Sequence, residues 1–509
     1  MTGRILIAGA GPSGLLCAVE LAARGVPCRV VDRRPGPAGG SRCPTLWQRT
    51  LRVLDAAGVS VEALRRAGTA LERKRFLIAG ADAEVDLRSG DGPFAAPLLI
   101  RQEDLERLLL ERLRALGGAV EYGVELLEVR RNDGGASRHG AGAPAVVVLR
   151  GPDGVEEAPV DRVVCATGAA GRVAGVTGPA DVAPVGMRWL LADVSVAPED
   201  TPAPGVEHIL RDHAGHGGLV PLPGGGHRLF LALPDDPSGA DRQPTPAEVV
   251  EAARRSVGVR LTGEPGAIWA VRPRSWVADA FVDGPVVLLG DAARSFPMPV
   301  HGLNTGLQEA AELGWKLAAA ASLPAEAGAE LLATHDAERR TAAERIRERA
   351  ERVLGYGSTV PLEVIRDRLL ARVFELRTEP ETVHAPGPLT AAGGGALAGH
   401  RVPEDAGRAA GPGWYVALLP GSDPARPGRP GAEAGRAAAA VAARFGLPLV
   451  ACPAVPAAGS GNAAGAPEGV PDAGARLLLV RPDGHVSFDG SPAEPAVLER
   501  HLQSVRRFL

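Results

Sequence analysis

The chain has 509 residues, enough for about three domains at roughly 150 residues each. Hydrophobic residues make up 45% and charged residues 23%, which is the balance of a globular protein and excludes a wholly disordered chain. The formal net charge is −4 and the basic residues are spread along the chain, which argues against nucleic acid or an anionic membrane as a partner. The sequence has no secretory leader and no apolar run long enough to span a membrane, so we expect a cytoplasmic protein.

The cysteines and histidines predict neither a disulfide framework nor a metal site. The 5 cysteines are an odd number and form no CxxC pair, which favours reduced thiols. His213 and His216 have a ligand-like spacing, but they lie in a Gly-rich segment without acidic or cysteine neighbours, so we expect both to be exposed to solvent. Cys165 is expected to be a small buried hydrophobic residue.

The N-terminal segment predicts a strand, a turn, a helix and a second strand. Residues 4–8 form a short apolar run, residues 15–24 have helical spacing, and residues 26–32 again favour a strand. The turn at 9–14 has the sequence Gly-Ala-Gly-Pro-Ser-Gly, a GxGxxG motif in the position where dinucleotide-binding proteins carry it.

Each glycine of this motif has a physical reason. Gly9 allows the tight turn, Gly11 lets a pyrophosphate approach the main chain, and Gly14 lets the helix pack closely against the strand. The anion would lie at the helix N-terminus, where free N–H groups favour negative charge. Asp32, at the end of the second strand, is placed to accept hydrogen bonds from a ribose, so the segment predicts a bound dinucleotide.

The remaining elements predict an α/β protein with a β-rich insertion. Short β-like segments separated by Gly/Pro turns between about 175 and 280 indicate a mostly antiparallel sheet inserted into the nucleotide-binding fold. The helix over 334–354 is dense in Arg and Glu at i,i+4 positions and is expected to face solvent. We expect further helices over 50–57, 101–116, 302–321 and 432–445, and strands over 119–130, 145–165, 189–194, 218–222, 228–233, 286–289, 414–419, 477–480 and 486–488.

A second strand-Gly-Asp-helix element near residue 290 indicates a long ligand that spans both halves of the fold, which favours FAD over NAD. Asp291 can accept a hydrogen bond from a ribityl hydroxyl group. The helix that begins near Gly302 can direct its N-terminal amides at the flavin edge that becomes negative on reduction, an effect of about 0.3–1 kcal/mol.

Together these motifs resemble the class A flavoprotein monooxygenases, the para-hydroxybenzoate-hydroxylase-like enzymes that include polyketide and phenol hydroxylases. The residues that carry the resemblance are the motif at 9–14, Arg42, Arg101-Gln102-x-x-Leu105-Glu106, Gly290-Asp291-Ala292-Ala293, Pro297, Gly302-Leu303-Asn304-Thr305-Gly306 and Leu313-Gly314-Trp315-Lys316-Leu317. The resemblance implies an FAD site formed by Gly9, Gly11, Pro12, Ser13, Gly14, Asp32, Arg33, Arg42, Gln102, Gly290, Asp291, Pro297, Gly302, Leu303 and Asn304.

The resemblance also implies the fold and the reaction. It implies a doubly wound, Rossmann-like FAD domain at 1–174 and 281–378, an antiparallel substrate-binding sheet at 175–280, a linker at 379–412 and a thioredoxin-like domain at 413–509. In the family, NADPH or NADH reduces the flavin, and a C4a-hydroperoxide then oxygenates a small molecule, here an aromatic or polyketide-type intermediate of antibiotic biosynthesis. Trp189 and His301 are candidate substrate contacts, no catalytic acid or base is assigned, and a monomer or homodimer is expected.

Three departures from the family pattern bear on the reaction. Thr167 replaces an Asp linked to nicotinamide cofactor handling, Arg294 replaces a His, and residues 299–302 read Pro-Val-His-Gly instead of Gly-Gly-Gln-Gly. Bulk at Val300 and His301 would crowd the flavin face where the hydroperoxide forms. Relatives with a redox-silent FAD catalyse cyclisations such as [4+2] additions, and this cyclase reading stands beside the monooxygenase one. An FAD-dependent oxidase or dehydrogenase and a flavin-storing protein are further alternatives.

Overall fold

The computed structural model describes most of the chain up to residue 355 and parts of the remainder. Among the predicted residues, Arg42, His213, Pro299 and Val300 lie outside the described residues, as does most of the predicted linker. The described residues are 4–37, 45–88, 92–131, 145–211, 215–234, 242–298, 301–355, 384, 388–391, 398, 413–419, 432–451, 476–491 and 495–508.

The chain divides into two compact units, which we describe separately. Unit 1 comprises Met1–Gly135, Gly142–Ala310 and Ala343–Glu379, and unit 2 comprises Ala136–Ala141, Ala311–Ala342 and Pro380–Leu509. Both division points near residues 310 and 342 fall inside helices, namely α6 (Gly302–Ala320) and α7 (Ala325–Gly355). Among the described residues, no helix is both long enough and apolar enough to cross a lipid bilayer.

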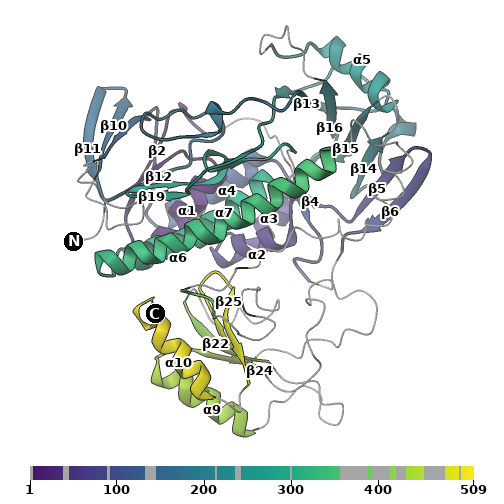
Figure 1. Cartoon of the computed structure of the whole chain (residues 1–509). Coiled ribbons are helices and arrows are strands. Elements are labelled where there is room, and N and C mark those ends of the chain that lie inside the picture. The colour runs from purple at the N-terminus through teal and green to yellow at the C-terminus, as the bar shows by residue number, and fades with distance from the viewer. Residues whose placement is uncertain are drawn as a thin grey trace. The chain divides into compact units, whose positions relative to one another are not determined.

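A six-stranded sheet in the order β19-β20-β12-β1-β2-β8 forms the centre of unit 1 (Figure 1). Neighbouring strands are parallel except for the pair β19–β20. The strand order reverses at β1, so the ends of β1, β2, β12 and β20 meet at one edge, where doubly wound folds bind nucleotides. The bounds are β1 Ile5–Ala8, β2 Cys28–Asp32, β8 Val120–Tyr122, β12 Arg162–Cys165, β19 Val282–Asp283 and β20 Val286–Leu288.

Helices and two small sheets complete this nucleotide-binding part. The sheet β11-β10-β9 shares a hydrophobic core with the central sheet, in which Leu6, Val147 and Val163 are buried. Cys165 is fully buried in the same core, as the sequence predicts. The bounds are α1 Pro12–Ala23, α2 Gln48–Ala56, α3 Val61–Ala67, α4 Gln102–Ala115, β9 Glu125–Arg130, β10 Ala145–Gly151, β11 Gly154–Val160, and for the sheet β3-β7-β4 Thr45–Leu46, Leu98–Ile100 and Gly68–Ala70.

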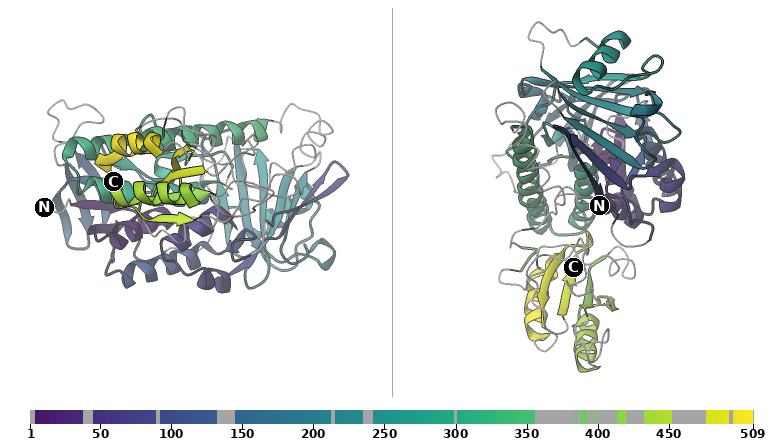
Figure 2. Two further views of the ribbon diagram at one scale, coloured as in Figure 1. Left: turned by 90° about the horizontal axis from the view of Figure 1, so that it is seen from below. Right: turned by 90° about the vertical axis from the view of Figure 1, so that its right-hand side faces the viewer.

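A seven-stranded sheet in the order β17-β13-β16-β15-β14-β5-β6 forms the second part of unit 1. The sheet is mostly antiparallel, as the sequence predicts, but β5 and β6 come from residues before the expected insertion, and β5 pairs with β14 in parallel. Figure 2 shows these two purple strands at one edge of the teal strands. The bounds are β5 Arg73–Ile78, β6 Ala81–Asp86, β13 Met187–Val194, β14 Val206–Arg211, β15 His216–Pro221, β16 His227–Pro234 and β17 Ile268–Val271.

The two faces of this sheet pack against different partners. Leu190, Leu219 and Leu229 share a core with Val249 of helix α5 (Pro246–Val257), which contacts β15 and β16. Because side chains alternate along a strand, Trp189 projects from the opposite face. This second face adjoins the nucleotide-binding part, because the Trp189 side chain donates a hydrogen bond to the Pro297 carbonyl oxygen.

Unit 2 contains a four-stranded sheet in the order β23-β22-β24-β25 together with parts of α6 and α7. Trp315 of α6 and Leu331 of α7 are buried in the same core as Trp414 and Leu477. A thioredoxin-like fold for residues 413–509 stays a prediction. The bounds are β22 Tyr415–Leu419, β23 Leu449–Ala451, β24 Arg476–Val480, β25 Val486–Gly490, α9 Ala432–Arg444 and α10 Pro495–Val505.

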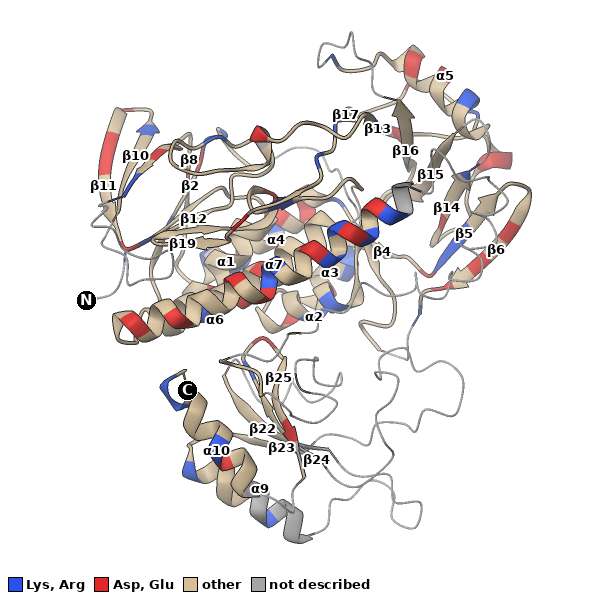
Figure 3. Cartoon of the chain, viewed as in Figure 1, with Lys and Arg blue, Asp and Glu red and all other residues tan. Residues whose placement is uncertain are grey.

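The prediction for the helix over 334–354 is partly wrong. α7 begins earlier, at Ala325, and acidic and basic residues alternate along it as expected (Figure 3). However, Arg339 is 2% exposed and Glu338 is also largely enclosed, since its side chain is 10% exposed. A charge-rich pattern predicts a solvated helix, because the sequence does not show which distant charges pair with it.

Candidate FAD site

The glycine turn after β1 has the geometry of a phosphate cradle. Gly9 has φ +110°, and a Cβ there would lie 2.2 Å from the Ala166 carbonyl oxygen. A Cβ on Gly14 would lie 1.9 Å from the Gly9 carbonyl oxygen, whereas one on Gly11 would meet nothing within 4 Å. The protein thus needs Gly9 and Gly14 for its own packing and leaves space in front of Gly11, which fits a diphosphate at the N-terminus of α1.

Asp32 is held in place at the end of β2. Its Oδ2 accepts hydrogen bonds from the Ala10 N–H (2.7 Å) and from Arg34 Nη2 (3.0 Å), and its Oδ1 accepts one from Arg34 Nε (3.0 Å). Burial alone would raise the pKa of Asp32, but the hydrogen bonds from the side chain and main chain of Arg34 and from Ala10 lower it overall. Asp32 is therefore an ionised acceptor, as a ribose-binding residue must be.

A cavity of about 230 Å³ lies beside this carboxylate and fits the adenosine half of FAD. Arg34 also pairs with the buried Glu106 of α4, at 3.5 Å, and Glu106 accepts a hydrogen bond from Gln102 (2.9 Å). The sequence predicts Arg33 and Gln102 as site residues and gives Glu106 only as part of the family motif, without a role, whereas Arg34 was missed. The lining residues include Gly9, Gly11, Asp32, Arg33, Arg34, Gln102, Glu106, Ala166, Thr167, Gly168 and Val173.

The Gly-Asp turn after β20 is the second predicted anchor for the cofactor. Gly290 has φ +65° and packs against Ser13, whose Oγ would lie 3.0 Å from a Cβ at Gly290. The Asp291 side chain is 53% exposed and its Oδ1 accepts a hydrogen bond from Arg294 Nη1 (2.8 Å). The turn thus brings Asp291 near the start of α6 with acceptor capacity left for a ribityl hydroxyl.

The segment between Asp291 and α6, and the first turn of α6, are each tied to a distant strand. Trp189 of β13 is 1% exposed, and its Nε1 donates a hydrogen bond to the Pro297 carbonyl oxygen at 2.9 Å. Asn304 is fully buried; its Oδ1 accepts from the Trp47 N–H (3.0 Å) and its Nδ2 donates to the Thr45 carbonyl (2.9 Å). The Asn304 side chain therefore fixes β3, while the cofactor contact expected of it stays a prediction.

Aromatic rings gather on the sheet face beside Trp189. The His216 ring meets Trp189 edge-on with ring centroids 5.8 Å apart, and Phe230 lies 6.2 Å from Trp189. The prediction that His216 is exposed is wrong: it is half-buried on β15, because the Gly-rich segment forms a strand instead of a turn. Burial, together with Arg211, lowers the pKa of His216 to about 4, so the ring is neutral at physiological pH.

His301 directly precedes α6, and its carbonyl oxygen accepts a hydrogen bond from the Thr305 N–H. Burial first, and then the charges of Arg349, Lys74 and Arg294, lower the pKa of His301 to about 4. A neutral imidazole here can donate from one nitrogen and accept at the other.

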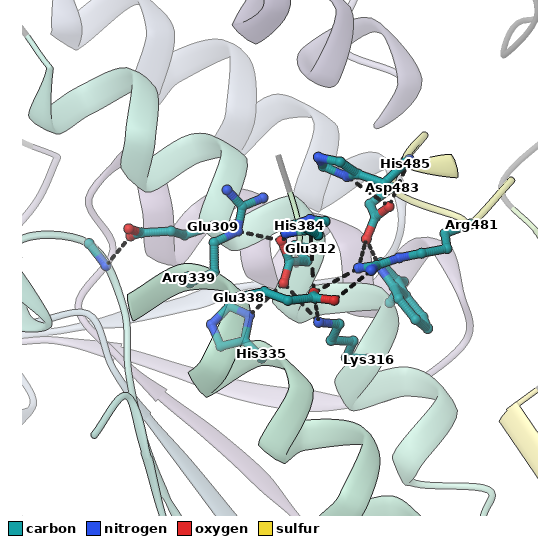
Figure 4. Close-up of polar contacts among 12 residues, drawn as sticks. Glu309, Glu312, Lys316, His335, Glu338, Arg339, His384, Arg481, Asp483 and His485 are labelled. Atoms are coloured by element: carbon teal, nitrogen blue, oxygen red, sulfur yellow. Dashed lines mark hydrogen bonds and ion pairs between the residues drawn. The ribbon is translucent and has the colours of Figure 1, made fainter. Parts of the chain in front are cut away.

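A separate buried cluster in unit 2 has metal-like geometry. Ligand atoms of Glu312, Glu338 and His384 lie within 4.8 Å of one another (Figure 4). However, Lys316 Nζ lies 2.8 Å from Glu312 and 2.7 Å from Glu338. The lysine ammonium occupies the position a cation would take, so the group is a salt-bridge cluster with an internal cation.

Comparisons with known proteins agree with this site. The family model described as "FAD binding domain" matches residues 3–350. The 6-methylpretetramide 4-monooxygenase of Streptomyces rimosus is 32% identical over 340 residues, covering 66% of this chain and 59% of the relative. The dialkyldecalin synthase of Streptomyces rugosporus is 31% identical over 384 residues, which cover 74% of this chain and 76% of the relative. The structure of aklavinone-11 hydroxylase with FAD and aklavinone has a TM-score of 0.67 at 25% identity, covering 99% of this chain and 98% of that one.

The chain therefore belongs to the FAD-binding family of the class A flavoprotein monooxygenases, and its cofactor is FAD. The predicted residues Gly9, Gly11, Asp32 and Gln102 come together around one cavity. Gly290 and Asp291, the predicted second anchor, directly follow β20 of the same sheet. The role of each residue toward FAD stays a prediction.

Proposed function

We propose that this chain is an FAD-dependent, NAD(P)H-using monooxygenase that hydroxylates an aromatic or polyketide-type natural-product intermediate. The observation that carries the proposal is the hydrogen bond between Trp189 and Pro297, which joins the aromatic face of the seven-stranded sheet to the segment leading into α6. A planar substrate would lie between that face and the flavin, against rings such as His216 and Phe230.

Bound FAD supplies electron transfer from the nicotinamide cofactor and activation of oxygen. The overall reaction converts an aromatic C–H bond, O₂, NAD(P)H and a proton into a C–OH group, water and NAD(P)⁺. The chain contributes positioning: the Gly11 turn receives the diphosphate, Asp32 the ribose and Asp291 the ribityl chain, while Trp189 and its neighbours exclude water.

The decisive experiment is anaerobic mixing of the FAD-bound protein with NADPH or NADH, followed by absorbance near the oxidised flavin band. We expect the flavin to bleach, and to do so faster when a phenolic polyketide is present. In a separate aerobic turnover, we expect ¹⁸O₂ to label the product. A flavin that neither nicotinamide cofactor reduces, with or without such a compound, would refute the monooxygenase proposal.

A redox-silent cyclase is the second candidate, and two observations favour it. The dialkyldecalin synthase matches a larger share of both chains than the 6-methylpretetramide 4-monooxygenase does, at nearly equal identity. Thr167 and His301, where the family pattern has Asp and Gln, point the same way. Folding a flexible substrate into a reactive geometry requires no redox step and can contribute roughly 7–11 kcal/mol. Product formation from a linear polyene under argon, with no nicotinamide cofactor, would support the cyclase.

Further proposals concern location, assembly and the C-terminal part. A reducing cytoplasmic location is supported by Cys17, Cys28 and Cys165, which are free cysteines among the described residues. A monomer or homodimer, and a thioredoxin-like fold at 413–509, are proposals that light scattering and an experimental structure would test.

A further inference from the structure

Arg294, on the two-residue strand β21 (Arg294–Ser295), is fully buried beside the Gly-Asp turn. Its Nη1 donates to Asp291 Oδ1 (2.8 Å) and its Nη2 donates to the Gly302 carbonyl oxygen (3.0 Å). The guanidinium also donates to Glu309 through Nε and Nη2, at 3.2 Å each. One side chain thus joins the turn after β20, the first residue of α6 and the interior of the same helix.

Glu309 completes the connection from the other side. Its side chain is 1% exposed, and its Oε2 also accepts a hydrogen bond from the Gly290 N–H at 3.2 Å. The residue before Asp291 is therefore held by Glu309, and the Asp291 side chain is held by Arg294. Without these contacts, the half-exposed Asp291 side chain would populate several rotamers.

The space around this guanidinium is closely filled. A Cβ on Gly306 would lie 3.3 Å from Arg294 Nη2 and 2.4 Å from Ser13 Oγ, and one on Gly302 would lie 3.2 Å from Asp291 Oδ1. The Arg294 guanidinium also lies over the Phe296 ring, 4.9 Å from its centroid. The phosphate turn, the Gly-Asp turn and the start of α6 consequently pack as one unit around Arg294.

We propose that Arg294 is a positioning residue for FAD, which holds Asp291 in its ribityl-binding orientation and fixes the start of α6 relative to the Gly-Asp turn. A planar fork is required, because a lysine ammonium cannot reach Asp291, the Gly302 carbonyl and Glu309 in the same geometry. This role concerns cofactor binding and is independent of whether the reaction is a hydroxylation or a cyclisation.

The charge state is consistent with the contacts. Burial alone would lower the pKa of Arg294, but Glu309 and Asp291 raise it overall, so the guanidinium stays charged. Removing one partner of such a buried group leaves the other without compensation. Variants must therefore separate loss of fold from loss of cofactor positioning.

The test uses Arg294→Lys and Arg294→Gln in the full chain, with FAD stripped and titrated back. We expect the FAD Kd to rise about 10- to 100-fold, as loss of hydrogen bonds to charged groups predicts, and the visible circular dichroism of bound FAD to change. Because Arg294 acts through Asp291, Arg294→Lys should add little further loss in an Asp291→Ala background.

Arg481→Gln is the matched control, because Arg481 is an equally buried arginine, paired with Glu338 and Asp483 inside unit 2. It should lower thermal stability and leave the FAD Kd unchanged. If Arg294→Gln does not fold, Glu309→Gln, which keeps an acceptor for Gly290, should give an intermediate rise in Kd. Wild-type Kd and an unchanged flavin spectrum in Arg294→Lys, or additive losses with Asp291→Ala, would overturn the proposal.

Discussion

The Trp189 indole and the Pro297 carbonyl oxygen form a hydrogen bond of 2.9 Å in the buried interior of unit 1. Trp189 belongs to the seven-stranded sheet, whereas Pro297 follows the Gly-Asp turn of the nucleotide-binding part. This bond therefore joins the seven-stranded sheet to the segment that leads into α6.

Replacing this tryptophan tests that relationship. Trp189→Phe keeps a ring but removes the N–H donor, so we expect a loss of about 1 kcal/mol in unfolding free energy for the hydrogen bond and a similar loss for the smaller ring. The FAD Kd should change little, while substrate KM rises. Trp269→Phe, on the same sheet beneath the Arg228 guanidinium, is the control. An unchanged KM in Trp189→Phe would show that Trp189 does not contact the substrate.

The phosphate turn offers two alanine variants with opposite expectations. Gly14→Ala places a Cβ 1.9 Å from a main-chain oxygen that cannot move freely, so the apoprotein should lose about 1–3 kcal/mol or more of stability. Gly11→Ala meets nothing within 4 Å, so the apoprotein should unfold at the wild-type temperature but bind FAD at least about tenfold more weakly. Thermal unfolding with and without FAD separates the two effects. Normal FAD affinity in a folded Gly11→Ala protein would contradict the assigned diphosphate position.

The sequence predicted the cofactor turns well because their signals are local. Glycine spacing, the strand before it and Asp32 at the next strand end all lie within one short segment. The structure places Gly9, Gly11 and Asp32 around one cavity, as expected.

Long-range pairings could not be predicted in this way. The parallel pairing of β5 with β14 joins residues far apart in the chain, and no local pattern identifies the partner. Arg34 was missed for the same reason, since its partner Glu106 lies on α4, far away in the chain. In α7, the pattern predicts that Glu338 faces solvent, but Glu338 pairs with Arg481, which has no periodic relation to the helix.

His216 predicts a pH dependence of stability. Its pKa is about 4 in the folded protein and near 6.5 when unfolded, so between these values the unfolded state binds more protons and stability falls as pH falls. The slope is at most about 1.4 kcal/mol per pH unit for one such group. His216→Gln should reduce the slope of the unfolding free energy against pH between pH 6.5 and 4, measured by urea denaturation. An unchanged slope would mean that this ring is protonated in the folded state.

Lys316 provides the internal cation of the unit 2 cluster, and this assignment predicts the effect of metal removal. Because its ammonium lies between Glu312 and Glu338, a chelator should leave the unfolding temperature unchanged. Lys316→Met should cost about 3–5 kcal/mol, because two largely buried carboxylates then lose their shared partner. In that variant, added Zn²⁺ should recover part of the loss, since His384 and both carboxylates become accessible ligands. Destabilisation of the wild-type protein by EDTA would instead assign the position to a metal ion.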